Sequence, residues 1–279
     1  MTLRPKSAPL RCDCQARHFT RVFSYDAPPE REVRFTFSAG GRYEREVWQC
    51  GVCRHLVSLH EMDPGPLYSG EYVSSTYGDD GIATAFERIA ALPPERSDNA
   101  GRVARIVDFA KGHFGPRTIA PAVLDVGSGL CVFLNALKVH GWRCTALDPD
   151  ARAVRHARER VGIAAVQGTF ESAAALGRFD VITFNKVLEH VDDPIAMLEK
   201  AALHLERSGF VYVEVPDGEV AARDGKDREE FFIDHPHVFS AASLALLAAR
   251  AGFDVRALER LKEPSTKYTL RAFLVARRP

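Results

Sequence analysis

The segment that decides the fold is residues 123–133, "VLDVGSGLCVF", because an apolar run there ends in Asp125 and is followed by Gly127 and Gly129. Glycine tolerates positive φ angles and lets a ligand approach the backbone closely. In open α/β sheets, ligands bind beyond the carboxyl ends of the strands, where a turn of this kind opens a helix. The segment therefore predicts an α/β protein with a ligand at this turn.

The sequence around this segment alternates between strand-like and helix-like stretches from about residue 119 onward. Strand-like stretches such as 179–185 "FDVITFN" and 210–216 "FVYVEVP" are almost entirely apolar. Such strands are typical of a parallel sheet that helices cover on both faces. Between these two strands, the pattern at 193–209 predicts a helix. The predicted fold is a Rossmann-like, doubly wound, mostly parallel sheet of seven strands.

The last two strand-like stretches, 253–261 and 268–278, are joined only by the short segment 262–267, "KEPSTK". A crossover between parallel strands needs a dozen residues or more. These two strands are therefore predicted to form an antiparallel C-terminal hairpin at the edge of the sheet.

Composition places the chain among globular proteins without a strong overall charge. Of its 279 residues, 46% are hydrophobic and 27% are charged, and Lys+Arg and Asp+Glu number 37 each. This balance gives no general attraction to nucleic acid or to an acidic membrane surface. No apolar run approaches the roughly 20 residues that span a bilayer, and the first residues lack the apolar core of a signal peptide. We expect a cytoplasmic protein with no membrane partner.

Three regions differ in their sequence pattern and predict three parts of the chain. Residues 1–66 hold short β-type runs and four of the six cysteines, and they end at the turn-forming "DPGP". Residues 67–118 combine a tyrosine-rich stretch with two helical patterns and predict a helical linker or lid. Residues 119–279 form the α/β region. We expect a small β-rich metal-binding segment, a linker and a catalytic domain.

The clustered cysteines of the first region predict a metal site. Cys50 and Cys53 have the C-x2-C spacing that lets two thiolates reach one tetrahedral zinc ion. A second, tighter pair precedes them, and a segment of about 60 residues needs such a staple because its own core is small. The predicted ligands of a structural Zn2+ are Cys12, Cys14, Cys50 and Cys53. Reduced cysteines without metal are the alternative. If one pair is wrong, the replacement ligands are His18, His55 or His60.

Two cofactor classes use a glycine turn of this kind, dinucleotides and S-adenosylmethionine. The dinucleotide fingerprint G-x-G-x-x-G requires a third glycine where this sequence has Val132. Asp125 would repel a pyrophosphate, whereas it suits the α-ammonium group of a methionine moiety. Asp148 ends the next strand about 20 residues on, where an acid can accept hydrogen bonds from both ribose hydroxyls. These residues favour S-adenosylmethionine.

Residues 119–279 resemble the class I S-adenosylmethionine-dependent methyltransferases. The resemblance rests on "LDVGSG" at the glycine turn, "ALD" at the ribose acid, and "FDVIT" with "VLEHVDDP" in the fourth strand and its loop. The stretch "HVFSAASLALLAARAGFDV" after the fifth strand matches as well. The residues and the resemblance together predict the cofactor-binding set Asp125, Gly127, Ser128, Gly129, Asp148, Pro149, Gly168, Thr169, Phe170 and Asn185.

Two departures from the pattern of these methyltransferases concern the loops at the cofactor site. Cys131 stands where the glycine loop usually has its third glycine. The third strand also lacks the acid that many members place near the adenine, and Thr169 or Glu171 is the expected replacement. The geometry of the glycine loop is therefore less strongly predicted than the identity of the ligand.

The front of the chain resembles a bacterial subgroup in which a cysteine-rich zinc-binding segment precedes the catalytic domain, as in sugar C-methyltransferases. In this subgroup an acid–histidine pair lies ahead of a Phe-Ser dipeptide, and residues 234–235 and 239–240 match this pattern. The resemblance implies that His235 is the base that takes a proton from the acceptor. His237 is the close alternative, because Pro236 turns the chain between the two histidines. Either histidine could instead have only a structural role.

The predicted function is methyl transfer from S-adenosylmethionine to a small-molecule acceptor, a sugar nucleotide or another metabolite, at carbon or oxygen. The alternative is an RNA or protein methyltransferase that grips its polymer with the cysteine segment. The first sixty residues hold 10 Arg+Lys against 6 Asp+Glu, an excess too small for a nucleic-acid footprint. We therefore expect no nucleic-acid partner. A degenerate scaffold is a third possibility, against which the intact Asp125 and Asp148 argue.

Overall fold

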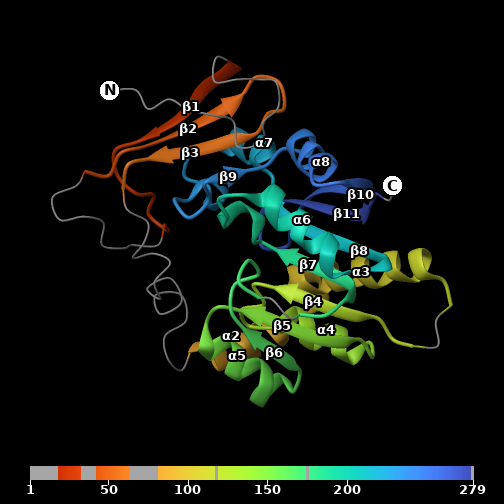
Figure 1. Ribbon diagram of the computed structural model, residues 1–279. Helices are drawn as coiled ribbons and strands as arrows, with labels where there is room; N and C mark the ends of the chain where they lie inside the picture. The colour runs from red at the N-terminus through yellow and green to blue at the C-terminus, as the bar shows by residue number, and fades with distance from the viewer. Residues whose placement is uncertain (1–17, 33–41, 63–80, 117–118, 174–175, 278–279) are drawn as a thin grey trace.

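The computed structural model describes residues 18–32, 42–62, 81–116, 119–173 and 176–277, which form two β-sheets with helices around the larger one (Figure 1). The smaller sheet is antiparallel and has the strand order β1-β2-β3-β9. Its strands are β1 (Phe19–Tyr25), β2 (Arg45–Cys50), β3 (Leu56–His60) and β9 (His237–Val238). The N-terminal part of the chain is therefore β-rich, as predicted.

The larger sheet has seven strands in the order β10-β11-β8-β7-β4-β5-β6. Five neighbouring strands are parallel, and β11 runs antiparallel to both β8 and β10. The strands are β4 (Ala122–Val126), β5 (Arg143–Asp148), β6 (Ala164–Gln167), β7 (Phe179–Asn185), β8 (Leu205–Pro216), β10 (Phe253–Lys262) and β11 (Tyr268–Ala276). This order confirms the predicted doubly wound, Rossmann-like sheet with a C-terminal hairpin at its edge.

Helices cover both faces of the larger sheet (Figure 1). One core cluster joins α6 and α8 to the sheet through residues such as Leu198 and Leu247. A second cluster joins α3, α4 and α5 to the opposite face through residues such as Ile106, Leu134 and Val154. The helices are α2 (Gly81–Ala90), α3 (Asp98–Phe114), α4 (Val132–Val139), α5 (Ala151–His156), α6 (Pro194–His204), α7 (Gly218–Ala221) and α8 (Ala241–Arg250). Every helix in the described ranges is too short or too polar to cross a bilayer.

The helix predicted for 193–209 is wrong at its C-terminal end, because α6 stops at His204 and β8 begins at Leu205. Tertiary pairing explains the difference, since Leu205 and Phe210 are buried and pair with β7. Gly209 permits this close pairing: a Cβ at that position would lie 2.7 Å from the carbonyl oxygen of Asp180. Pairing with a buried strand therefore overrides a local helical pattern.

The two sheets are joined through the segment that follows β8. Strand β9 belongs to this segment, yet it pairs with β3, so that Val57 lies opposite His237. The hydroxyl of Ser240 also donates to the carbonyl oxygen of Cys53 at 2.6 Å. A Cβ at Gly218 would lie 2.6 Å from Val238 Cγ1, so only glycine fits at this junction. The limits proposed for the three parts of the chain remain predictions, but the N-terminal sheet includes a strand from the last of them.

Candidate active site

The predicted glycine turn lies between β4 and α4, at the carboxyl edge of the sheet. Gly127 has φ 67° and donates its N–H to the carbonyl oxygen of Leu147 at 2.8 Å. A Cβ at Gly127 would lie 2.9 Å from Val187 Cγ2, so a side chain is excluded there. Cys131, at the place of the third glycine, adopts φ 58° and precedes α4 as its N-cap. The loop therefore has a left-handed residue at this place. That conformation is strained for a residue other than glycine.

Asp125 lies near the end of β4, and two residues of the neighbouring strand β7 hold its carboxylate. Thr183 Oγ1 donates to Asp125 Oδ1 at 2.6 Å and Asn185 Nδ2 donates at 2.7 Å. Burial raises the pKa of Asp125 to about 6, although both hydrogen bonds oppose the rise. A cationic group of a ligand would favour the ionised form. The position therefore suits the ammonium group for which Asp125 was predicted.

Asp148 ends β5 beside the same turn, and its carboxylate holds the turn in place. Its Oδ2 accepts the N–H of Gly129 at 2.8 Å, and its Oδ1 accepts the N–H of Asp150 at 2.9 Å. Burial raises the pKa of Asp148, and these two hydrogen bonds oppose the rise. The structure thus brings Asp148 and the glycine turn together at one edge of the sheet.

The remaining predicted cofactor residues fall into two groups. Ser128 is buried within the turn, and Pro149 follows Asp148 on the surface of the same edge.

The second group follows β6. Gly168 has φ 149° and donates to the Asp148 carbonyl oxygen at 3.0 Å. Thr169 is exposed and bonds Ser172. The ring of Phe170 packs edge-on against Phe184 in the core, with centroids 5.7 Å apart. The Phe170 side chain is therefore a buried part of the hydrophobic core.

A cavity of about 290 Å3 lies beyond the carboxyl ends of β7 and β8. Lys186, the residue after Asn185, is one of its lining residues. Most of its lining residues carry charged, histidine or aromatic side chains. Its lining residues include Lys186, Glu189, His190, Phe232, Asp234 and His235. Glu189 and His190 were assigned no role in the function by sequence, because "VLEHVDDP" reads only as the loop after a strand. Their proximity to His235 arises from folding across more than forty residues.

The two histidines predicted as alternative bases lie in different surroundings. His235 lines the cavity, and its Nδ1 lies 3.1 Å from the carbonyl oxygen of Glu230. Burial lowers the pKa of His235, and the Asp234 carboxylate opposes this change. His237 lies in β9, where its Nδ1 is 3.3 Å from His55 Nε2. Burial lowers the pKa of both members of that pair. Of the two, His235 lines this cavity, whereas His237 belongs to the junction of β9 with β3, and the role of either as a base stays a prediction.

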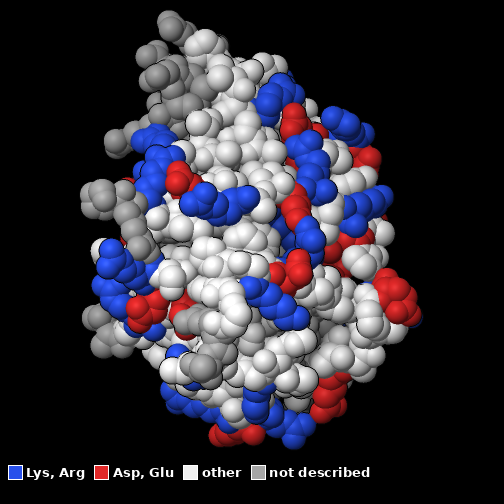
Figure 2. All heavy atoms as spheres, turned by 90° about the vertical axis from the view of Figure 1, so that its right-hand side faces the viewer, with Lys and Arg blue, Asp and Glu red and all other residues white. Residues whose placement is uncertain are grey.

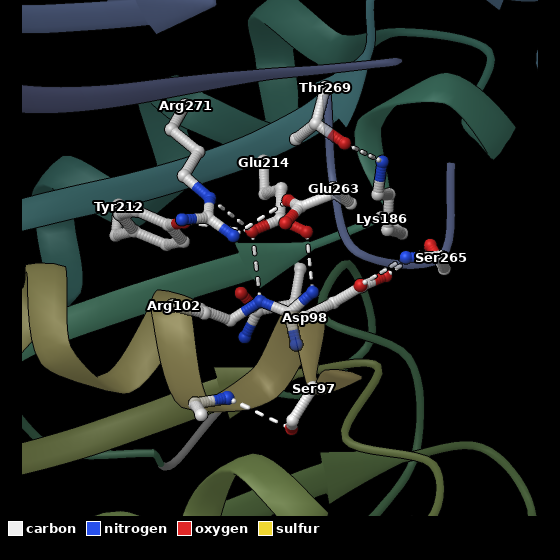
Figure 3. Close-up of polar contacts among 12 residues, drawn as sticks. Ser97, Asp98, Arg102, Lys186, Tyr212, Glu214, Glu263, Ser265, Thr269 and Arg271 are labelled. Carbon is white, nitrogen blue, oxygen red and sulfur yellow. Dashed lines mark hydrogen bonds and ion pairs between the residues drawn. The ribbon is translucent and has the colours of Figure 1, made fainter. Parts of the chain in front are cut away.

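Side chains from β8, β11 and α3 form a network of buried ion pairs near the carboxyl end of β8 (Figure 3). Glu214 lies at its centre and is bound by Arg102, by Arg271 Nε at 3.1 Å and by the Tyr212 hydroxyl at 2.8 Å. Arg271 in turn reaches Glu263 at 2.6 Å. Burial alone would raise the pKa of Glu214, but the charge and hydrogen bond of Arg102, together with the charges of Lys186 and Arg271, outweigh it and hold that pKa well below its usual range.

The same network affects the cofactor edge. The charge of Arg102, from α3, opposes the rise that burial causes in the pKa of Asp125. Lys186 follows β7 with φ 60° and donates to Thr269 Oγ1 at 3.1 Å, which fixes the cation at the cavity wall (Figure 3). The sequence places Lys186 at the mouth of the fourth strand of the α/β region, but it gives no signal for Arg102, because a lone arginine on a helix has no local pattern.

The predicted zinc ligands are only partly described by the structure. Cys12 and Cys14 lie outside the described residues. Cys50 ends β2, Cys53 lies in the following turn, and both are buried. The backbone N–H of Val52 lies 3.4 Å from Cys50 Sγ, a contact that suits a thiolate in a metal-binding turn. The described half of the set therefore fits a zinc knuckle, and the four-cysteine site remains a prediction.

The chain matches a family model described as a methyltransferase domain over residues 81–258, more than half of its length, and it belongs to this family. The ubiquinone biosynthesis O-methyltransferase of Erwinia tasmaniensis is 31% identical over 163 residues, which cover 56% of this chain and 62% of that enzyme. The enzyme of the same name from Vibrio campbellii is 32% identical over 56% of this chain and 64% of its own length. The chain thus spans less than two-thirds of these relatives.

Solved structures show the same fold. Magnesium protoporphyrin IX methyltransferase from Synechocystis PCC 6803, with bound S-adenosylhomocysteine, has a TM-score of 0.56 and 14% identity. The alignment covers 74% of this chain and 99% of that protein. Together, the strand order and the family membership identify the larger sheet as the catalytic fold of the class I S-adenosylmethionine-dependent methyltransferases.

Proposed function

We propose that this protein transfers the methyl group of S-adenosylmethionine to an oxygen atom of a small-molecule acceptor. The observation that carries the proposal is the placement of Asp125, Asp148 and the glycine turn at one sheet edge. Asn185 holds the Asp125 carboxylate, and the next residue, Lys186, lines a small cavity. The two relatives named above are O-methyltransferases. A sugar nucleotide as acceptor, and transfer to carbon, remain the alternative within this proposal.

The proposed mechanism needs little chemistry from the protein, because a sulfonium methyl group is already a good electrophile. Asp125 and Asp148 would hold the two ends of the cofactor, so that the methyl group points to the cavity. An acceptor hydroxyl in the cavity must then lose its proton and lie in line with the S–CH3 bond. We assign this step to the surroundings of Glu189, His190 and His235, which line the cavity together.

The experiment that tests this function has two stages. Calorimetric titration of the full chain with S-adenosylhomocysteine should show one site. Incubation with labelled S-adenosylmethionine and panels of hydroxylated aromatics and sugar nucleotides should then transfer label, and His235→Gln should reduce transfer by about 10²-fold or more while the affinity for S-adenosylhomocysteine is kept. If the chain binds no S-adenosylhomocysteine, the fold serves as a scaffold and the proposal fails.

A polymer acceptor receives less support from the charges. On the face that Figure 2 shows, basic and acidic side chains are interspersed. A nucleic-acid footprint would instead gather basic groups along one stripe. Binding of bulk RNA at physiological salt in a mobility-shift assay would reverse our preference.

We also propose that Cys50 and Cys53 provide half of a structural zinc site, which rests on their spacing and burial. The purified chain should contain one zinc ion, and Cys53→Ser should lose it. A Cys144→Ser variant is the matched control, because Cys144 is also buried but lies in β5. Equal zinc content in all three proteins, or none in the wild type, would contradict the site.

A further inference from the structure

The three side chains to which we assign loss of the acceptor proton, Glu189, His190 and His235, also have the composition of a metal site. Glu189 and His190 lie in the short helix Leu188–His190 after β7, and His235 lies in the loop before β9. One ligand atom from each lies within 4.8 Å of the other two, and all three side chains line the same cavity. A separation of this size leaves room for one ion between them.

The two histidines are oriented in the way that metal ligands require. His190 Nδ1 lies 2.7 Å from the carbonyl oxygen of Asp234, and His235 Nδ1 lies 3.1 Å from that of Glu230. A carbonyl oxygen can only accept, so each Nδ1 carries a hydrogen, and in the neutral ring each Nε2 keeps its lone pair. His235 Nε2 also lies 3.8 Å from Asp234 Oδ2. Backbone carbonyls that fix the tautomer and the ring plane are the usual support of metal-bound histidines.

Glu189 supplies the second, independent observation. Its side chain is fully buried, and within the described residues neither of its oxygens accepts a hydrogen bond. An ionised carboxylate in this state is costly, and buried charges are normally paired or coordinated to a metal. Lys186, a partly buried cation that lines the same cavity, donates to Thr269. A cation between Glu189 and the two imidazoles would satisfy the carboxylate.

We propose that Glu189, His190 and His235 bind one divalent transition-metal ion that activates the acceptor hydroxyl; this step rests on the methyl transfer proposed above. Two imidazoles and one carboxylate suit Zn2+, Co2+ or Fe2+, and three protein ligands leave coordination positions open. These positions would face the cavity that the three residues line.

The chemistry of the step is balanced without a further reactant. The acceptor oxygen binds the ion, which lowers the pKa of the hydroxyl, and its proton passes to water. The oxygen then forms a bond to the methyl carbon while the S–CH3 bond breaks and its electron pair stays on sulfur. The products are the methyl ether, S-adenosylhomocysteine and one proton. An acceptor with two adjacent oxygens, such as a catechol or a vicinal diol, would fit two open positions best.

The test uses Co2+ as the probe, because its visible spectrum reports coordination. One equivalent should bind the full chain and give visible bands without the near-ultraviolet thiolate band that binding at the cysteines would add. Glu189→Gln and His190→Gln should each weaken Co2+ binding by at least about tenfold. Glu229→Gln is the matched control: Glu229 lines the same cavity, but its carboxylate pairs with Lys267 at 3.1 Å, so binding should be unchanged.

Two results would overturn the metal site. The first is a wild-type chain that binds S-adenosylhomocysteine but no Co2+ outside the cysteines, which leaves the proposed methyl transfer intact. The second is Co2+ binding that Glu189→Gln and His190→Gln leave unchanged, which places the ion elsewhere. Because Co2+ and S-adenosylhomocysteine are titrated separately, failure of the metal site and failure of the methyltransferase proposal give different patterns. The thermal unfolding of each variant shows whether a loss of binding is merely a loss of fold.

Discussion

Two glutamates of this protein are both fully buried, yet their surroundings differ in almost every respect. Glu214 is held by two arginines and a tyrosine in the network of Figure 3. Glu189 receives no hydrogen bond within the described residues and faces two histidines across a cavity. A buried charge that is fully paired stabilises one arrangement of the chain, whereas one that lacks partners is tolerated only where a ligand or a proton can meet it.

The largest expected effect is on Glu214. Glu214→Gln should lower the free energy of unfolding by about 3–5 kcal/mol, because Arg102 and Arg271 then remain buried without their shared partner. Urea unfolding measures this change. Since the folded pKa of Glu214 is depressed, its stabilisation is present above the ordinary carboxyl pKa and is lost as the pH falls below it.

Glu189→Gln provides the direct comparison and should change the free energy of unfolding by less than about 1 kcal/mol in metal-free buffer, because no partner is left behind. Destabilisation as large as that of Glu214→Gln would show that Glu189 is paired after all, and the contrast between the two glutamates would disappear.

A third buried carboxylate, Asp148, is held by backbone N–H groups and lies at the cofactor edge. Asp148→Ala should weaken S-adenosylhomocysteine binding by more than tenfold, since a hydrogen bond to a charged group contributes roughly 1.5–3 kcal/mol. Calorimetry measures the affinity, and circular dichroism should show an intact fold. Unchanged affinity would mean that the ribose lies elsewhere.

Asp125 should make cofactor binding depend on pH. Its pKa of about 6 means that at pH 5 most molecules must lose a proton before they pair with the ammonium group. The affinity for S-adenosylhomocysteine should therefore rise up to about tenfold between pH 5 and pH 7. Because the folded pKa is raised, the contribution of protonated Asp125 to stability is lost as the pH rises through about 6. If the affinity for S-adenosylhomocysteine depends on pH in the wild type but not in Asp125→Asn, the effect belongs to this residue.

The smallest effect belongs to an exposed ion pair. Arg277 Nε lies 2.8 Å from Asp254 Oδ1, with both side chains about half exposed. Arg277→Ala should change the free energy of unfolding by less than about 0.5 kcal/mol, and added salt should reduce even that. A loss near that of Glu214→Gln would mean that distance alone, rather than burial, sets the strength of these pairs.

The sequence predicted those parts of the molecule that depend on local pattern. Apolar runs located the seven strands of the larger sheet, and the short 262–267 connection predicted the hairpin of β10 and β11. The turn at Gly127 and the acid at Asp148 were placed correctly at one edge, because neighbouring parallel strands end together. Their role as cofactor ligands remains a prediction.

What the sequence did not predict depends on contacts between distant residues. The early end of α6 follows from the pairing of Leu205 with Phe179, which no helical pattern reveals. The cluster of Glu189 with His235 is formed by two loops that only the folded sheet brings together. For the same reason the Glu214 network, built from α3, β8 and β11, has no signature in any single segment.

The pairing of β3 with β9 has a consequence for the order in which the molecule assembles. During synthesis, β3 leaves the ribosome long before residues 237–238, so its outer edge must wait for a strand made near the end of translation. Pairings between such distant residues are slow to form, and an unpaired strand edge can associate with other chains meanwhile. The N-terminal sheet should accordingly be the last part of the protein to become protected from hydrogen exchange during refolding.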